Sequence, residues 1–182
     1  MSLRIYGNRS LKTLPGQDTR PTLARVREAV FNIWQGSIEH CRWLDLCAGS
    51  GSMGAEALCR GAAIVVGIEQ SPRACTVIEQ NWQQVVKPEQ TYQLLRGDVM
   101  KRLEKLSGQQ FDHIYFDPPY ASELYVPVLN AIATLKLLAP DGELAVEHRP
   151  KLVLPDVVPH LSLTAVRQKR YGSAALTFYS AL

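Results

Sequence analysis

Residues 44–69 read LDLCAGSGSMGAEALCRGAAIVVGIE, and this stretch predicts the fold. An apolar strand runs to Ala48, and the glycine motif G-x-G-x-x-G from Gly49 to Gly54 separates it from a helix and a second apolar strand. The glycines allow a tight turn and a close approach of the backbone to a ligand. Glu69 ends the second strand 20 residues after Gly49, the spacing of a carboxylate that holds a ribose diol. The stretch therefore predicts a site for a nucleoside-containing cofactor.

The chain beyond this stretch continues the alternation of strands and helices. We expect strands at 43–47, 64–69, 91–96, 112–117 and 143–148, and helices at 53–60, 72–86, 99–106 and 123–138. Alternating apolar strands and helices form a mostly parallel sheet with helices on both faces. Pro140-Asp141-Gly142 is expected to turn into the last of these strands. The fold class is therefore α/β and Rossmann-like.

The two ends of the chain differ from this pattern. Residues 161–166 and 174–179 are strands separated by too short a segment for a helical crossover, which predicts an antiparallel hairpin at the sheet edge. Residues 3–14 predict a hairpin or irregular arm, and Thr22 is expected to cap a helix that reaches about Gln35. We therefore expect an N-terminal arm and helix at 1–36 and a single globular unit at 37–182.

The composition and charge of the chain limit the classes of protein to which it can belong. The first 27 residues hold six Lys/Arg and one acid, and residues 161–182 hold three and none, although the chain of 182 residues has a net charge of only +3. Basic ends around a predicted nucleoside site favour contact with a polyanion. The four cysteines lack C-x-x-C spacing, no apolar run reaches membrane-helix length, and no secretory signal is evident. We expect a cytoplasmic protein with reduced thiols, no metal and no membrane partner.

A second motif, Asp117-Pro118-Pro119-Tyr120, follows the apolar run that ends at Phe116. The prolines stiffen the turn and remove two N–H donors, so it presents mostly acceptors. Acceptors beside a stacking ring suit the exocyclic amine of a flat nucleobase. A tight surface turn is the alternative for the motif, and a core tyrosine is the alternative for Tyr120.

Taken together, these motifs resemble those of class I S-adenosylmethionine-dependent methyltransferases, whose seven-stranded sheet carries the same antiparallel hairpin. The chain is most similar to the RsmD type, the small-subunit (16S) ribosomal RNA guanine-N2 methyltransferases. The segments that carry this closer resemblance are Arg20-Pro21-Thr22, residues 27–32 and Lys169-Arg170-Tyr171-Gly172. The resemblance covers essentially the whole chain.

The resemblance implies roles for individual residues. The catalytic set is Asp117, Pro118 and Tyr120. The residues expected to bind S-adenosylmethionine are Asp45, Ala48, Gly49, Ser50, Gly51, Glu69, Gln70, Asp98, Val99 and Asp117. The cations expected to contact ribosomal RNA are Arg4, Arg9, Arg20, Arg27, Lys169 and Arg170. Asp45 could instead order the glycine loop, and Asp98 could cap the helix that follows it.

Other functions stay open at this point. An amino-methyltransferase acting on another RNA or on DNA, at adenine N6 or cytosine N4, shares the Asp-Pro-Pro-Tyr motif. A nicotinamide-dependent oxidoreductase would explain the glycine loop and Glu69 but not that motif, and a non-catalytic RNA-binding module would not explain the intact loop. The short basic arms favour an assembled or assembling small ribosomal subunit over naked RNA as the substrate of a monomeric enzyme.

Overall fold

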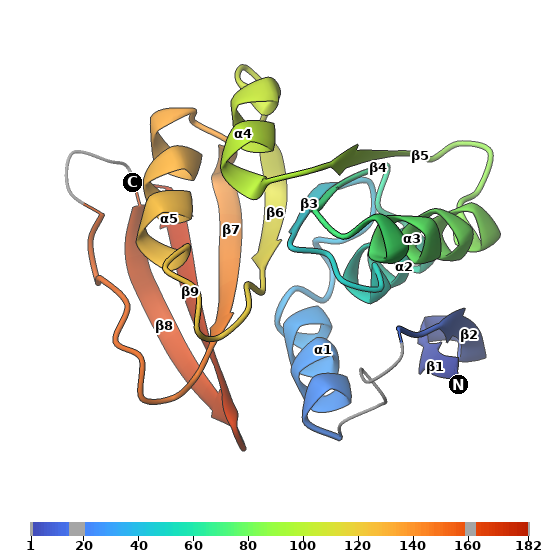
Figure 1. The fold of residues 1–182 in the computed structure, drawn as a ribbon, viewed down its shortest axis with the longest axis horizontal. Coiled ribbons are helices and arrows are strands. Elements are labelled where there is room, and N and C mark those ends of the chain that lie inside the picture. Colours follow the sequence, from blue (N-terminus) through green and yellow to red (C-terminus); the bar gives the residue numbers. More distant parts are fainter. Residues whose placement is uncertain (1, 15–20, 159–162, 182) are drawn as a thin grey trace.

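The computed structural model describes residues 2–14, 21–158 and 163–181. Its main sheet has seven strands in the order β5-β4-β3-β6-β7-β9-β8 (Figure 1). The first five in this order run parallel, and β9 and β8 run antiparallel to β7 and to each other. The strands are β3 (Arg42–Leu46), β4 (Ile64–Glu69), β5 (Thr91–Arg96), β6 (Phe111–Phe116), β7 (Leu138–His148), β8 (Leu163–Tyr171) and β9 (Ala174–Ala181). The predicted parallel sheet with an edge hairpin is confirmed.

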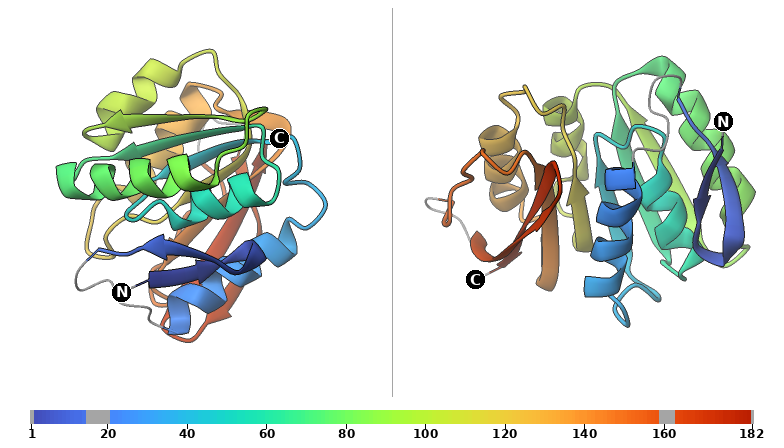
Figure 2. Two further views of the ribbon diagram at one scale, coloured as in Figure 1. Left: turned by 90° about the vertical axis from the view of Figure 1, so that its right-hand side faces the viewer. Right: turned by 90° about the horizontal axis from the view of Figure 1, so that it is seen from below.

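Helices cover both faces of this sheet (Figure 2). Side chains alternate along each strand, so Trp43 packs on one face of β3, and Leu44 and Leu46 pack on the other. The first face is covered by α1 (Pro21–Ile33), α2 (Ser52–Cys59) and α3 (Pro72–Val85). The second is covered by α4 (Val99–Leu103), the short 3-10 helix Glu104–Leu106 and α5 (Tyr125–Thr134).

Some predicted boundaries were wrong. Helix α5 ends at Thr134, not 138, because Lys136 takes a left-handed φ of 52° that a helix cannot continue. Strand β7 then begins at Leu138 and includes Pro140-Asp141-Gly142, where we expected a turn. The pairing of β7 with β6 shifts register there, which is how a strand accommodates a proline.

Two boundaries near the basic ends also differ from the prediction. Helix α1 begins at Pro21, so Thr22 lies inside the first turn and does not precede it as a cap. Proline suits the first helical position because its fixed φ is helical and its missing N–H has no partner there. Strand β8 extends to Tyr171, so Lys169 and Arg170 belong to a strand and not to the hairpin turn.

Gly54 of the motif and Gly67 of β4 make room for one large side chain, Trp82 of α3, which is fully buried. A Cβ atom at Gly54 would lie 2.5 Å from Cζ2 of Trp82, and one at Gly67 would lie 2.4 Å from Cη2. The indole N–H donates to the carbonyl of Gly51 at 2.7 Å. These glycines are therefore needed for helix-to-strand packing around the indole ring.

The N-terminal residues form the predicted hairpin, with β1 (Ser2–Ile5) and β2 (Arg9–Lys12) joined by a 3-10 turn at Tyr6–Asn8. Ile5 and Leu11 are buried and belong to the same apolar cluster as Phe31 of α1. Along the described part of the chain, we find no helix with the length and apolar character needed to cross a membrane.

Candidate functional site

A cavity of about 610 Å³ opens at the carboxyl ends of the parallel strands. It spans the point where the strand order reverses, between β3 and β6, which is where open α/β sheets bind ligands. Its walls come from the loops after β3, β4, β5 and β6, from the end of β7, from the N-terminal segment and from Arg27 of α1. Among the described residues, no group of three or more His, Cys, Asp or Glu side chains could hold a metal ion.

The glycine loop after β3 forms one wall and is held by two buried carboxylates. Asp45 is 2% exposed, and its Oδ2 accepts the N–H of Gly54 at 3.0 Å. Gly49 donates its N–H to Oε2 of Glu69 at 2.9 Å. Gly49 and Gly51 have φ values of 57° and 72°, which glycine adopts without strain. Asp45 therefore orders the loop, the alternative we considered for it, and also lines the cavity.

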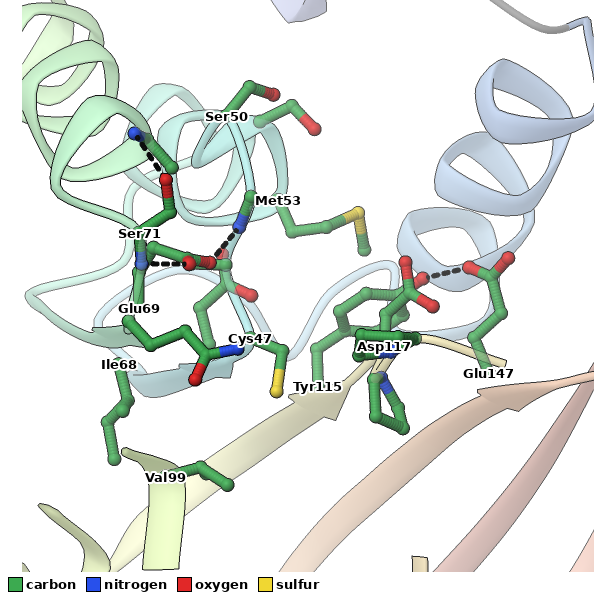
Figure 3. A pocket seen from close by; sticks show the side chains of 18 of the residues that line it. Cys47, Ser50, Met53, Ile68, Glu69, Ser71, Val99, Tyr115, Asp117 and Glu147 are labelled. Atoms are coloured by element: carbon green, nitrogen blue, oxygen red, sulfur yellow. Dashed lines mark hydrogen bonds between the residues drawn. The ribbon is translucent and has the colours of Figure 1, made fainter. Parts of the chain in front are cut away.

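Glu69 is the last residue of β4, and its side chain lines the cavity. Its Oε1 accepts the N–H of Ser71 at 2.8 Å, and Ser71 in turn caps α3 through Ala74. Each carboxylate oxygen can accept a second hydrogen bond, so both Glu69 oxygens retain acceptor capacity for a ligand. Figure 3 shows Glu69 and Ser71 together on the glycine-loop side of the cavity.

Most of the predicted cofactor-binding residues line this one cavity. Asp98 follows β5, separated from it by Gly97, and is exposed; it caps α4 by accepting the N–H of Lys101 at 3.1 Å, so the predicted capping role is present. Gly51 is the exception: it is buried against Trp82 and does not line the cavity. The predicted residues that do line it are Asp45, Ala48, Gly49, Ser50, Glu69, Gln70, Asp98, Val99 and Asp117.

The Asp-Pro-Pro-Tyr turn forms the opposite wall. Asp117 and Pro118 line the cavity together with Tyr120. Tyr120 is not a core residue, since it is partly exposed, and its hydroxyl donates to Oε1 of Glu147 at 2.8 Å. Tyr115 of β6 donates to Oε2 of the same carboxylate at 2.5 Å (Figure 3). The motif is therefore tied to the end of β7 through Glu147.

Burial shifts the ionisation of the acids around this cavity. It raises the pKa of Asp45 to about 8, against a smaller lowering by the Gly54 hydrogen bond. Burial also raises the pKa of Asp117 well above its usual range, and the nearby Glu147 and Asp45 add to that shift. The pKa of the Cys47 thiol rises to about 12, mainly by burial, so Cys47 is a neutral thiol. A cationic ligand would favour the ionised carboxylates, so the cavity suits positive charge.

The predicted RNA-contacting cations have different environments. Arg27 is only 6% exposed, and its Nε lies 2.6 Å from Oε2 of Glu56 in α2. Arg27 is therefore not an exposed surface cation, because its charge is matched inside the protein, although it lines the cavity. Four of the predicted cations are exposed, and Arg20 lies outside the described residues; the exposed ones are Arg4, Arg9, Lys169 and Arg170.

Our sequence prediction missed two residues of the site and a third residue beside it. Glu147 and Tyr115 line the cavity, and the Arg149 guanidinium lies 5.5 Å from the centre of the Tyr120 ring. The available signal was position: Glu147 is next to the end of a parallel strand, on the edge where Glu69 and Asp117 were recognised. The sequence shows an acid within an apolar strand, but this alone does not distinguish a residue of the site from a charged residue at the edge of the sheet.

The chain is similar to known proteins over nearly its whole length. The family model described as Conserved hypothetical protein 95 matches residues 3–180. Ribosomal RNA small subunit methyltransferase D of Escherichia coli (strain K12) is 31% identical over 186 residues, covering 97% of this chain and 89% of that protein. YlbH of Bacillus subtilis (strain 168) is 33% identical over 175 residues, covering 94% and 92%. The solved structure of yhhF from Escherichia coli superposes with a TM-score of 0.85 at 29% identity, covering 100% and 98%.

Proposed function

Because this chain belongs to the Conserved hypothetical protein 95 family, that of the RsmD-type methyltransferases, we propose that it methylates small-subunit ribosomal RNA. The methyl group passes from S-adenosylmethionine to the exocyclic N2 amine of a guanine. One observation supports this reaction most: the Asp-Pro-Pro-Tyr turn and the glycine loop with Glu69 line the same cavity. A methyl donor and a target amine can therefore meet there.

The cavity suits S-adenosylmethionine in size and charge. Its volume of about 610 Å³ is in the range of small-molecule sites. The cofactor, when bound, supplies an activated methyl group on a sulfonium, and it also carries an ammonium group. Asp45 and the other buried acids complement those positive charges. We assign the ribose hydroxyls to Glu69 and the adenine amine to Asp98, whose carboxylates keep acceptor capacity beyond their backbone hydrogen bonds.

The opposite wall suits a flipped-out base. The amine of guanine is a weak nucleophile because its lone pair is delocalised into the ring. We propose that Asp117 and the Pro118 carbonyl accept its N–H groups, which localises that lone pair and aligns it with the methyl group. Tyr120 stacks on the base. One N2 proton leaves once nitrogen has gained the methyl group, and Asp117 is our candidate acceptor.

The exposed cations favour a ribosomal particle as the substrate. Arg4 and Arg9 lie on the N-terminal hairpin, and Lys169 and Arg170 lie on β8. Few phosphate contacts give weak, strongly salt-dependent binding to naked RNA. We propose that proteins of an assembled or assembling subunit supply further contacts, with this chain acting as a monomer.

Labelled-methyl transfer would test the proposal. The substrates are unmodified small ribosomal subunits, the same RNA stripped of protein, and duplex DNA, followed by nucleoside analysis. We expect N2-methylguanosine from subunits, a lower yield from stripped RNA, and none with Asp117→Ala. Equal methylation of stripped RNA and subunits would overturn the proposal that the particle is the substrate. Methyladenine or methylcytosine in DNA would overturn the substrate but keep the chemistry.

A further inference from the structure

Glu147 has no part in the function described above, yet it is one of the most buried charges of the molecule. It is 1% exposed, it lies next to the end of β7, and it lines the cavity. Its two carboxylate oxygens are held by different hydroxyls, Oε2 by Tyr115 at 2.5 Å and Oε1 by Tyr120 at 2.8 Å. A buried acid held this way has a fixed orientation relative to the Asp-Pro-Pro-Tyr turn.

The hydrogen bonds around Glu147 determine what this wall can offer a ligand. A tyrosine hydroxyl has one proton to donate, and both Tyr115 and Tyr120 direct theirs to Glu147. The remaining hydrogen-bonding capacity of all three groups is therefore for accepting. Asp117, directly after the neighbouring strand β6, adds another carboxylate to the same side of the cavity (Figure 3). This wall therefore presents hydrogen-bond acceptors, and it suits a ligand whose facing edge carries hydrogen-bond donors.

Among the nucleobases with an exocyclic amine, guanine has such an edge. Its N2 amine is adjacent to the N1–H, so two donor groups lie side by side. In adenine and cytosine the ring nitrogen next to the amine is an acceptor, and an enzyme that flips a base reads this edge. We propose that Glu147 selects guanine by accepting its N1–H while Asp117 accepts from the neighbouring N2 amine. This inference rests on the proposed function, because it assumes that a base enters the cavity.

The free energy lost when a base other than guanine faces Glu147 determines how strongly guanine is preferred. With adenine or cytosine in place, the buried Glu147 would face a ring acceptor and lose a hydrogen bond in a desolvated site. Sites built to pair with a donor discriminate strongly against analogues that lack it. Burial raises the pKa of Glu147, and the two tyrosine hydrogen bonds lower it, so the tyrosines favour the ionised, accepting form.

The test combines one substitution at Glu147 with one altered base at the target position. Once the methylated guanine is mapped, small subunits are reconstituted with guanosine or 2-aminopurine at that position. 2-Aminopurine keeps the amine, but its N1 is an acceptor and it lacks the O6 carbonyl of guanine. We expect wild-type kcat/KM to be about 10- to 100-fold higher for guanosine. Glu147→Gln, whose amide can donate to N1, should lower this ratio, because the loss of O6 affects both enzymes alike and only the partner of N1 differs between them.

Controls separate selection from a structural role. Glu143→Gln changes a second acid of β7 that does not line the cavity, and it should leave the ratio at its wild-type value. Glu147→Asp keeps a carboxylate, so it should lower the rate and preserve the preference for guanosine. Melting temperature and cofactor binding report whether each variant is folded.

The outcomes distinguish this inference from the function on which it rests. If Glu147→Gln lowers both rates by the same factor, Glu147 is structural and the inference is wrong, although the proposed function stands. A wild-type ratio near one overturns the inference even if no Glu147 variant folds. If the wild-type enzyme puts no methyl group on the N2 of guanine, the proposed function and the inference both fail.

Discussion

Replacing Asp45 with asparagine should make the protein more stable at alkaline pH. The side chain is 2% exposed, and burial raises its pKa from 3.8 to about 8. An acid whose pKa is raised in the folded state stabilises that state below the unfolded pKa, and this stabilisation is lost as pH rises through the folded value. The stabilisation by Asp45 is therefore lost between about pH 4 and about pH 8.

The magnitude follows from the size of the shift. About four pKa units at about 1.4 kcal/mol each give an upper limit on the order of 5 kcal/mol. The asparagine side chain would keep an oxygen for the N–H of Gly54, the 3.0 Å bond that orders the glycine loop, without a charge to bury. We therefore expect the unfolding free energies of wild type and Asp45→Asn to differ least at pH 5, by about 1 to 2 kcal/mol, and to differ by several kcal/mol at pH 9.

Urea unfolding at pH 5, 7 and 9, without S-adenosylmethionine, would measure this difference. Asp98→Asn is the matched control, because its carboxylate is exposed and caps α4 in the same way as an asparagine would. A difference between wild type and Asp45→Asn that stays constant from pH 5 to pH 9 would refute the reasoning. It would mean that Asp45 is not neutralised by burial and that its charge is already compensated in the folded protein.

Three further changes test separate parts of the structure. Asp117→Ala should lower methyl transfer at least ~100-fold while leaving S-adenosylmethionine affinity largely intact, as measured by single-turnover assays and calorimetry; unchanged transfer would remove Asp117 from the mechanism. Gly67→Ala should lower the free energy of unfolding by about 1 to 3 kcal/mol, because its Cβ would lie 2.4 Å from Trp82, and urea unfolding would detect a failure of this expectation. Arg27→Ala should cost about 1 to 3 kcal/mol, because Oε2 of Glu56 loses its partner while Oε1 keeps Arg60 at 2.8 Å; a loss of RNA affinity at full stability would contradict the buried ion pair.

The sequence was sufficient for the parts of the molecule that depend on local pattern. The strand, glycine loop and helix from 44 to 69 follow from apolar runs and from glycine conformations, and both sides of the cavity follow from motifs at strand ends. Glu147 and Tyr115 could not be predicted, because their pairing depends on which strands are neighbours in the sheet and on side-chain direction. Arg27 was assigned to RNA for a similar reason, since sequence shows a cation but not the buried acid on another helix that pairs with it.

The attachment of the N-terminal hairpin could not be predicted from the sequence either, because it also depends on contacts between elements that are distant along the chain. Asn81 of α3 is fully buried, and its side chain accepts the N–H of Lys12 at 2.9 Å and donates to the carbonyls of Lys12 and Ser50 at 3.0 and 2.9 Å. Arg27 adds a second link, because its Nη2 donates to the carbonyl of Arg4 at 2.8 Å while its Nε pairs with α2. The hairpin that carries Arg4 and Arg9 is thus fastened to the glycine loop and to the helix that follows it. The position of these exposed cations therefore depends on the element that we assign to the cofactor, so the candidate RNA-binding arm and the candidate cofactor site are parts of one packed unit.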